Sequence, residues 1–282
     1  MSLPALMPAL RHRALRLGAR LLSCALLAAS ILATPSRAGA QIAVVGNAVD
    51  EHEAGPGQRY VSSITVRNLT GQPQPVRVYQ TDYRFSADGT SNFDSAGTVA
   101  RSNAAWIKPS ASAITIPPLA DVVLNYAVTV PTIDSLRGTY WSTIMVEGQP
   151  RLPPQARHGQ VGLGSVFRYA VQVATHLPTA GSRKVRLTRQ GAFTDSTRAR
   201  VLDVVVENTG ERAYRPNLWV ELYDARGVLR KRLEQQRGLL YPGTSVKQHF
   251  DFGTLPAGVY KALVFADTGD DTVSAAQYKL TY

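Results

Sequence analysis

The sequence predicts an all-β protein built from two sandwiches, and three observations carry that prediction. Short apolar segments with a period of two recur along the chain, and glycine and proline separate them roughly every ten residues. No amphipathic pattern of helical length interrupts them. The chain is also long enough for two cores of about 100 residues each. We therefore expect two immunoglobulin-like β-sandwiches that follow an N-terminal leader.

The first forty residues have the layout of a secretory signal peptide. Arginines without any acidic residue come first, an apolar run from Leu21 to Ala33 follows, and Ala38-Gly39-Ala40 forms an A-x-A cleavage site. The run is shorter than the roughly 20 residues that span a bilayer, so we expect no permanent membrane anchor. The only cysteine, Cys24, lies in this run, so no disulfide is expected in the mature chain. These features predict an exported protein, in the periplasm or at the cell surface.

The charge of the chain is moderately basic. The formal net charge of +11 falls to +6 without the five arginines of the leader, Arg11, Arg13, Arg16, Arg20 and Arg37. Such an excess favours anionic partners, such as a cell-wall polymer or an acidic pilus subunit, although an ordinary solvated surface explains it equally well. Nucleic acid is not expected as a partner, because no pattern of interleaved aromatic and basic residues is present.

The first sandwich is assigned to residues 41–178 and the second to residues 183–282. Strands are expected in the first near Ile42–Val49, Tyr60–Asn68, Val76–Tyr83, Ala113–Ile116, Val122–Val130, Thr139–Glu147 and Val166–Leu177. The second is expected to contain Lys184–Arg189, Ala199–Glu207, Leu218–Tyr223, Val228–Gln235, Val246–Phe252, Val259–Ala266 and Ala275–Tyr282. Of these, Val228–Gln235 fits a helical turn almost as well as a strand, and we assign it to strand.

The segments between the strands also carry predictions. Asp88-Gly89 predicts a tight turn inside a polar stretch, which would form an extra hairpin. Trp106-Ile107 is expected to be a short buried piece. Residues 148–164 mix proline, glycine and charge without periodicity and predict an exposed loop, and residues 178–182 predict a hinge between the sandwiches.

The two halves of the chain repeat the same elements. Ile64–Asn68 is followed by Thr70-Gly71, and Val204–Asn208 is followed by Thr209-Gly210. Asparagine suits the end of a strand because its side chain bonds the nearby main chain and tolerates turn geometry. The repeat therefore predicts the same strand and turn in both sandwiches.

A second repeated element is the tripeptide Gly-x-Tyr, which ends at Tyr140 in the first half and at Tyr260 in the second. At the start of a strand such a tyrosine can form a corner, in which its hydroxyl bonds the upstream backbone. Alternatively, the two tyrosines are amphipathic core residues.

Catalysis is not expected. The sequence has no G-x-S-x-G elbow, and His52, His158, His176 and His249 lie in unrelated contexts. No glycine-rich phosphate loop follows a strand and opens a helix. We therefore expect neither an enzyme nor a bound cofactor.

Metal binding is not expected either. Glu51-His52-Glu53 is too compact to chelate a metal from one strand, because alternate side chains point to opposite faces. The acidic residues Asp267, Asp270 and Asp271 are interpreted as a solvated hairpin tip rather than a calcium loop. The basic cluster of Arg226 and Arg230–Arg232 is either a functional patch or an edge strand kept soluble by charge.

Four elements of the first half belong together: Val61–Asn68 continuing through Gln80, Trp106–Pro109, Pro117-Pro118 and Gly138–Tyr140. In these elements residues 42–177, about half of the chain, resemble the N-terminal domain of PapD-like periplasmic pilus chaperones. The strand Phe167–Val171 and the segment Leu255–Tyr260 also resemble WxL-interacting surface proteins, which bind peptidoglycan and proteins. Those proteins end in a transmembrane anchor that this sequence lacks.

The chaperone resemblance implies that a strand of this chain completes an unfinished partner, with backbone hydrogen bonds supplying affinity. The strand so implied is Val166–Leu177. On one face it carries the candidate partner-binding residues Phe167, Tyr169, Val171, Val173 and Leu177, with Arg168, Gln172 and His176 on the other. The alternative is that the first five fill the core of their own sandwich.

Pilus chaperones also anchor the partner's C-terminal carboxylate between an arginine on the first strand and a lysine on the donor strand. Here Ile42–Val49 contains no arginine and His176 stands near the place of the lysine, so Arg59 and Arg168 are the candidate substitutes. The resemblance implies a periplasmic chaperone or assembly factor for a β-rich pilus or surface subunit. The alternative is a non-catalytic envelope module that binds peptidoglycan or a surface protein.

Overall fold

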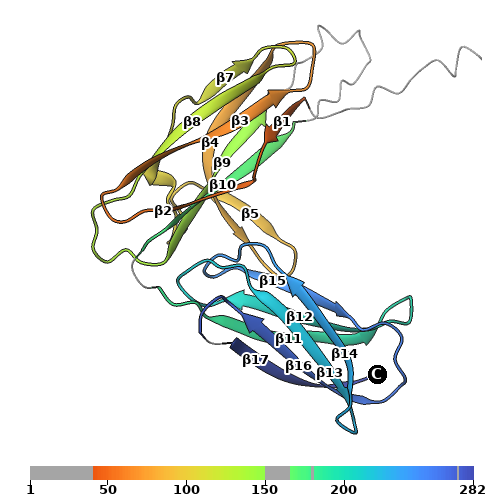
Figure 1. Ribbon diagram of the computed structural model, residues 1–282. Coiled ribbons are helices and arrows are strands. Elements are labelled where there is room, and N and C mark those ends of the chain that lie inside the picture. The colour runs from red at the N-terminus through yellow and green to blue at the C-terminus, as the bar shows by residue number, and fades with distance from the viewer. Residues whose placement is uncertain (1–40, 150–165, 179–180, 272) are drawn as a thin grey trace, which may run out of the picture. The chain divides into compact units, whose positions relative to one another are not determined.

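The computed structural model describes residues 41–149, 166–178, 181–271 and 273–282, and the ordered elements in these ranges are strands, apart from one 3₁₀ helix, Ala104–Trp106 (Figure 1). The predicted signal peptide and most of the predicted loop at 148–164 lie outside the described residues. Within them, no helix is long and apolar enough to cross a membrane. Residues 40–282 form one compact unit. The all-β prediction is confirmed, and the division into domains 41–178 and 183–282 stays a prediction.

The first sandwich packs two sheets around one core. One sheet has the order β1 (Ile42–Val45), β3 (Arg59–Asn68), β8 (Asp121–Thr129) and β6 (Ile107–Pro109). The other has the order β2 (Val49–Glu53), β10 (Arg168–His176), β9 (Thr139–Gly148), β4 (Gln74–Phe85) and β5 (Ser91–Ser95), and β7 (Ala113–Ile116) also pairs with β4. Alternate residues of both sheets point inward, and Ile64, Leu124, Val146 and Val173 meet in the core.

The segment expected as one strand, Ile42–Val49, is two strands in different sheets. β1 pairs antiparallel with β3, whereas β2 pairs parallel with β10. Between them Gly46 has a φ of +107°, a conformation that glycine adopts without steric cost. The turn at this residue carries the chain from one sheet to the other, which corrects the single-strand prediction.

The second sandwich also consists of two sheets. Its first sheet has the order β11 (Val185–Thr194), β12 (Arg200–Asn208) and β15 (Ser245–Asp251). Its second sheet has the order β14 (Leu229–Gln236), β13 (Asn217–Asp224), β16 (Val259–Asp267) and β17 (Val273–Thr281). The assignment of Val228–Gln235 to strand is confirmed by β14. Val204, Leu218, Val220 and Val264 are fully buried between the sheets.

The repeated asparagines perform the same task in both halves. Asn68 donates from Nδ2 to the carbonyls of Gln72 and Pro117, and its Oδ1 accepts the N–H of Thr70. Asn208 donates to the carbonyls of Arg212 and Leu240 and accepts the N–H of Gly210. Both side chains are buried, so these bonds satisfy main-chain groups that have left the ladder.

The two Gly-x-Tyr elements differ. The hydroxyl of Tyr260 donates to the carbonyl of Pro256 at 2.8 Å, which confirms the tyrosine corner there. Tyr140 instead packs its ring 4.8 Å from that of Trp106, in keeping with the core alternative. The turn at Asp88-Gly89 is also confirmed, since it joins β4 to β5, and Gly89 has a φ of +88°.

Candidate functional site

Along the first part of β10, from Arg168 to Val171, the main-chain groups on one edge have no partner strand among the described residues. β10 pairs with β9 from Arg168 to His176, but with β2 only from Gln172 onward. The N–H of Gln172 donates to Ala48 at 2.8 Å on the β2 side. Because main-chain groups alternate along a strand, those of Arg168 and Ala170 point to the same side. No strand among the described residues pairs with them there.

A crevice of about 230 Å³ adjoins this region, where the chain crosses from β1 to β2. Its walls come from β1, β2, β3 and β10 and from the turn at Gly46, and they combine apolar side chains with polar ones. The lining residues are Val44, Val45, Gly46, Asn47, Val49, Asp50, Ser62, Ser63, Ile64 and Val171. Asp50 in this lining accepts hydrogen bonds from the hydroxyls of Tyr126 and Ser62. The crevice reaches β10 at Val171, next to the part of the strand that β2 does not cover.

Most of the predicted partner-binding face lies in the core of its own sandwich. Val171, Val173 and Leu177 are 3, 0 and 0% exposed and pack against other core residues. Tyr169 is partly buried, and its hydroxyl donates to the carbonyl of Ile42. Phe167 is partly exposed. The burial of Val171, Val173 and Leu177 favours the alternative that they fill the core of their own sandwich, and a partner-binding role for this face stays a prediction.

The three candidate carboxylate-binding residues do not form one group. Arg168 and His176 lie at opposite ends of β10, which at about 3.3 Å per residue separates them by roughly 26 Å. Arg168 pairs with Glu147, and Arg59 is an exposed residue at the start of β3. The structure does not bring Arg59, Arg168 and His176 together, and their role as substitutes for the carboxylate anchor stays a prediction.

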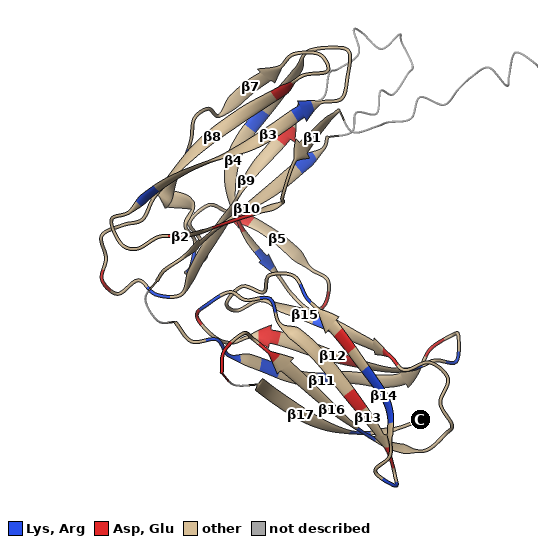
Figure 2. Ribbon diagram, in the orientation of Figure 1, with Lys and Arg blue, Asp and Glu red and all other residues tan. Residues whose placement is uncertain are grey.

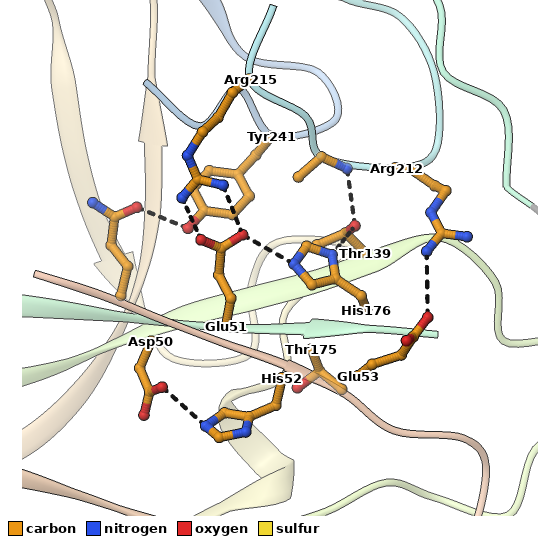
Figure 3. Close-up of polar contacts among 12 residues, drawn as sticks. Asp50, Glu51, His52, Glu53, Thr139, Thr175, His176, Arg212, Arg215 and Tyr241 are labelled. Atoms are coloured by element: carbon orange, nitrogen blue, oxygen red, sulfur yellow. Dashed lines mark hydrogen bonds and ion pairs between the residues drawn. The ribbon is translucent and has the colours of Figure 1, made fainter. Parts of the chain in front are cut away.

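His176 instead lies in a chain of hydrogen bonds between the two sandwiches (Figure 3). Its Nδ1 lies 2.9 Å from the hydroxyl of Thr139, which accepts the N–H of Ala213. Its Nε2 lies 3.2 Å from Glu51, and Arg215 holds the same carboxylate through both terminal nitrogens. A neutral imidazole with its proton on Nε2 satisfies this arrangement, because Thr139 then donates to Nδ1.

The pKa values of this cluster follow from its surroundings. Burial lowers the pKa of His176 below its ordinary value of 6.5, and the nearby Glu51 only partly opposes that effect. For Glu51, burial works to raise the pKa, but the hydrogen bonds from Arg215 and His176 outweigh it and leave the pKa lowered. At neutral pH the cluster therefore holds a neutral histidine beside an ion pair.

Aromatic residues form a second contact between the sandwiches. The rings of Trp141 and Tyr241 stack with centroids 4.6 Å apart. The hydroxyl of Tyr241, which lies beside Glu51 and Arg215 in Figure 3, donates to Gln172 at 2.8 Å. Tyr241 is fully buried, and this burial raises the pKa of its hydroxyl. Gln172 is the residue at which β2 begins to cover β10.

A pocket of about 360 Å³ lies beside the His176 cluster and carries both signs of charge. It is lined by Glu51, Glu53, His176, Arg183, Arg212, Ala213, Tyr214, Arg215, Leu239 and Thr268. Its arginines have acidic neighbours: Arg215 pairs with Glu51, Arg183 with Asp270, and Arg212 lies 3.9 Å from Glu53. The sequence analysis missed Arg212 and Arg215, because no local pattern sets them apart from other exposed arginines.

The remaining charged clusters have structural surroundings. Figure 2 shows both signs of charge along β13 and β14, where Arg230 pairs with Asp224 and Arg232 with Glu221. This pairing favours the interpretation of the basic cluster as a soluble edge. Asp267 accepts the N–H of Gly269 at the neighbouring hairpin tip. Within the described part of the chain, no group of acidic, histidine or cysteine residues has the arrangement of a metal site.

Of the three comparisons with known proteins, the search of solved structures finds similar chains. No family model matches the chain. No curated protein matches it either. The structure is similar to the class 5 fimbriae chaperone CfaA, with 8% identity, a TM-score of 0.45, and coverage of 84% of this chain and 98% of that chain.

Two further chaperones show a similar likeness. The E. coli chaperone DraB has 15% identity and a TM-score of 0.40, over 86% of this chain and 98% of that chain. The Pseudomonas aeruginosa chaperone CupB2 has 14% identity and a TM-score of 0.39, over 85% and 99%. All three of these structures are chaperones, the class of protein that the sequence was expected to resemble.

Proposed function

We propose that this chain is an exported, non-catalytic chaperone or assembly factor that binds a β-rich pilus or surface subunit by β-strand addition. The observation that supports the proposal is the edge of β10 at Arg168 and Ala170, which no described strand covers and which lies near a crevice of mixed polarity. Main-chain groups on such an edge give affinity for an added strand, and adjacent pockets give specificity for its side chains.

The mode of binding differs from the one expected from the sequence. Val171 and Val173 belong to the chain's own core, so they do not leave it to fill a partner. The added strand instead contributes side chains to the crevice between β1 and β10. Each new main-chain hydrogen bond contributes about 0.5–1.5 kcal/mol. A short edge therefore needs these side-chain contacts to reach stable binding.

Ala170→Pro tests the proposal directly. The substitution removes the N–H that points to the open edge, and proline is tolerated at a strand edge when its missing N–H faced solvent. Ala170→Thr is the matched control because it keeps the N–H. The readout is co-purification with a co-expressed β-rich exported subunit.

We expect Ala170→Thr to retain a subunit and Ala170→Pro to lose it, with both variants matching the wild type in thermal unfolding. In the wild-type complex, hydrogen exchange at Arg168 and Ala170 should slow, because their amides become bonded. Equal retention by both variants, or unchanged exchange at these amides, would show that the partner binds elsewhere.

A further inference from the structure

A row of charges crosses three strands and ends at the open edge of β10. Arg77 on β4 is the register partner of Glu147 on β9, and Glu147 is the register partner of Arg168 on β10. Their chain neighbours Val76, Val146 and Tyr169 face the core, so the three charged side chains share the outer face of the sheet. Across the sheet the signs therefore alternate, from positive to negative to positive.

The middle of this row is firmly held. Glu147 is only 7% exposed, and its carboxylate accepts hydrogen bonds from Tyr79 at 2.9 Å and from Gln149 at 3.2 Å. Burial works to raise the pKa of Glu147, but the bond from Tyr79 and the charge of Arg168 outweigh it, so the pKa is lowered. Glu147 is thus a fixed anion in the row.

Arg168, the last member of the row, contacts Glu147 through only part of its guanidinium group. Nε of Arg168 lies 2.6 Å from the carboxylate of Glu147, while the side chain as a whole remains 59% exposed. Among the described residues, nothing bonds its two terminal guanidinium nitrogens. Arginine presents five N–H donors in a rigid fork, so these nitrogens can accommodate a second carboxylate.

We infer that the strand which adds to β10 carries an acidic residue on its outer face, directly opposite Arg168. This inference rests on the proposed function and names the chemistry of its partner. Opposite charges on paired strands stabilise a sheet and like charges destabilise it. An acidic residue would continue the alternation. A lysine or arginine there would repel Arg168, and the anion beside Arg168, Glu147, also accepts hydrogen bonds from Tyr79 and Gln149.

Immobilised strand peptides provide the test. A peptide alternates valine with threonine, and each threonine in turn is replaced by Glu, Gln or Lys, so that one member of each series places the new residue opposite Arg168. Wild type, Arg168→Gln and Arg168→Glu/Glu147→Gln are compared on the same array. The double variant reverses the charge at the edge without leaving two glutamates side by side, and thermal unfolding verifies that each variant is folded.

For the wild type we expect Glu peptides to bind about two- to five-fold more tightly than Gln peptides at one position, with Lys peptides weakest. Arg168→Gln should remove the differences in affinity among the three peptides, and the double variant should reverse their order. Added salt should reduce the differences for the wild type. If wild type binds all three peptides equally, strand addition stands and the acidic preference is wrong. If wild type binds none of them, or if Ala170→Pro binds them as well as wild type does, strand addition at this edge fails as well.

Discussion

Nε2 of His176 lies 3.2 Å from the carboxylate of Glu51, and Arg215 holds that carboxylate from the other sandwich. The histidine therefore contacts, through a single carboxylate, a residue that comes from a distant part of the sequence. The side chain of His176 is mostly buried between Thr139 and Glu51. We therefore expect protonation of its imidazole to affect the contact between the two sandwiches. The groups that face it include Glu51, Glu53 and Arg212.

The first prediction concerns pH. The pKa of His176 in the folded chain lies below 6.5, its ordinary value, so the unfolded chain binds more protons as pH falls through that value. The contribution of the neutral histidine to the free energy of unfolding is therefore complete above pH 6.5 and is lost progressively as the pH falls below that value. We expect wild type to lose more stability than His176→Gln when pH falls from about 7.5 to about 5.5. Chemical unfolding at both pH values measures this, and equal losses would contradict it.

The second prediction concerns the pair of Glu51 and Arg215. The side chains are 26 and 46% exposed, so solvent screens part of their attraction. A double-mutant cycle with Glu51→Gln and Arg215→Ala should give a coupling of about 0.5–1 kcal/mol in the free energy of unfolding. In the same Glu51→Gln variant the pKa of His176 should fall further, because the anion that raises it is gone. NMR titration of the imidazole follows that shift, and a rise would refute the assignment.

The third prediction tests whether β10 keeps its valines for its own core. Val173 is fully buried, whereas Val166, just before β10, is 43% exposed. Val173→Ala should lower the free energy of unfolding by about 2 kcal/mol, because the loss of two methyl groups leaves a cavity. Val166→Ala should change it by less than about 0.5 kcal/mol. Denaturant unfolding compares the two, and similar values would place Val173 outside the core.

The fourth prediction compares the two Gly-x-Tyr elements. Tyr260→Phe removes the hydroxyl that bonds Pro256 and should cost about 1 kcal/mol, because a main-chain carbonyl loses its donor. Tyr140→Phe serves as its control, since the described contacts of Tyr140 are made by its ring. It should change stability by less than about 0.5 kcal/mol. A larger cost for Tyr140→Phe would mean that both tyrosines form corners.

Local patterns predicted most of the strands because period-two alternation and turn residues are encoded within a few positions. Asn68 and Asn208 are the best examples, since the side chain of each forms hydrogen bonds with main-chain groups within four residues and so closes the turn that follows its strand. β7 was predicted to the residue, and β14 was correctly distinguished from a helical turn. The asparagine repeat also revealed that the two sandwiches share one template.

Features that depend on distant residues were not predictable in this way. Alternation grouped Val171 with Val173 and Tyr169, but it does not tell whether a face meets its own core or a partner. Gly46 was predicted to lie inside a single strand, because local sequence does not reveal that β1 and β2 pair with different neighbours. Glu51 and Arg215 are 164 residues apart, and only the packing of the sheets brings them together.

The parallel strand β2 has a geometric consequence for any guest. It meets β10 at Gln172, and there Tyr241 contacts the same residue from the second sandwich. A strand that docks along β10 therefore runs into occupied positions after Val171 and has to turn away. If a strand adds to this edge as proposed, β2 limits it to a short stretch of backbone that ends before Gln172.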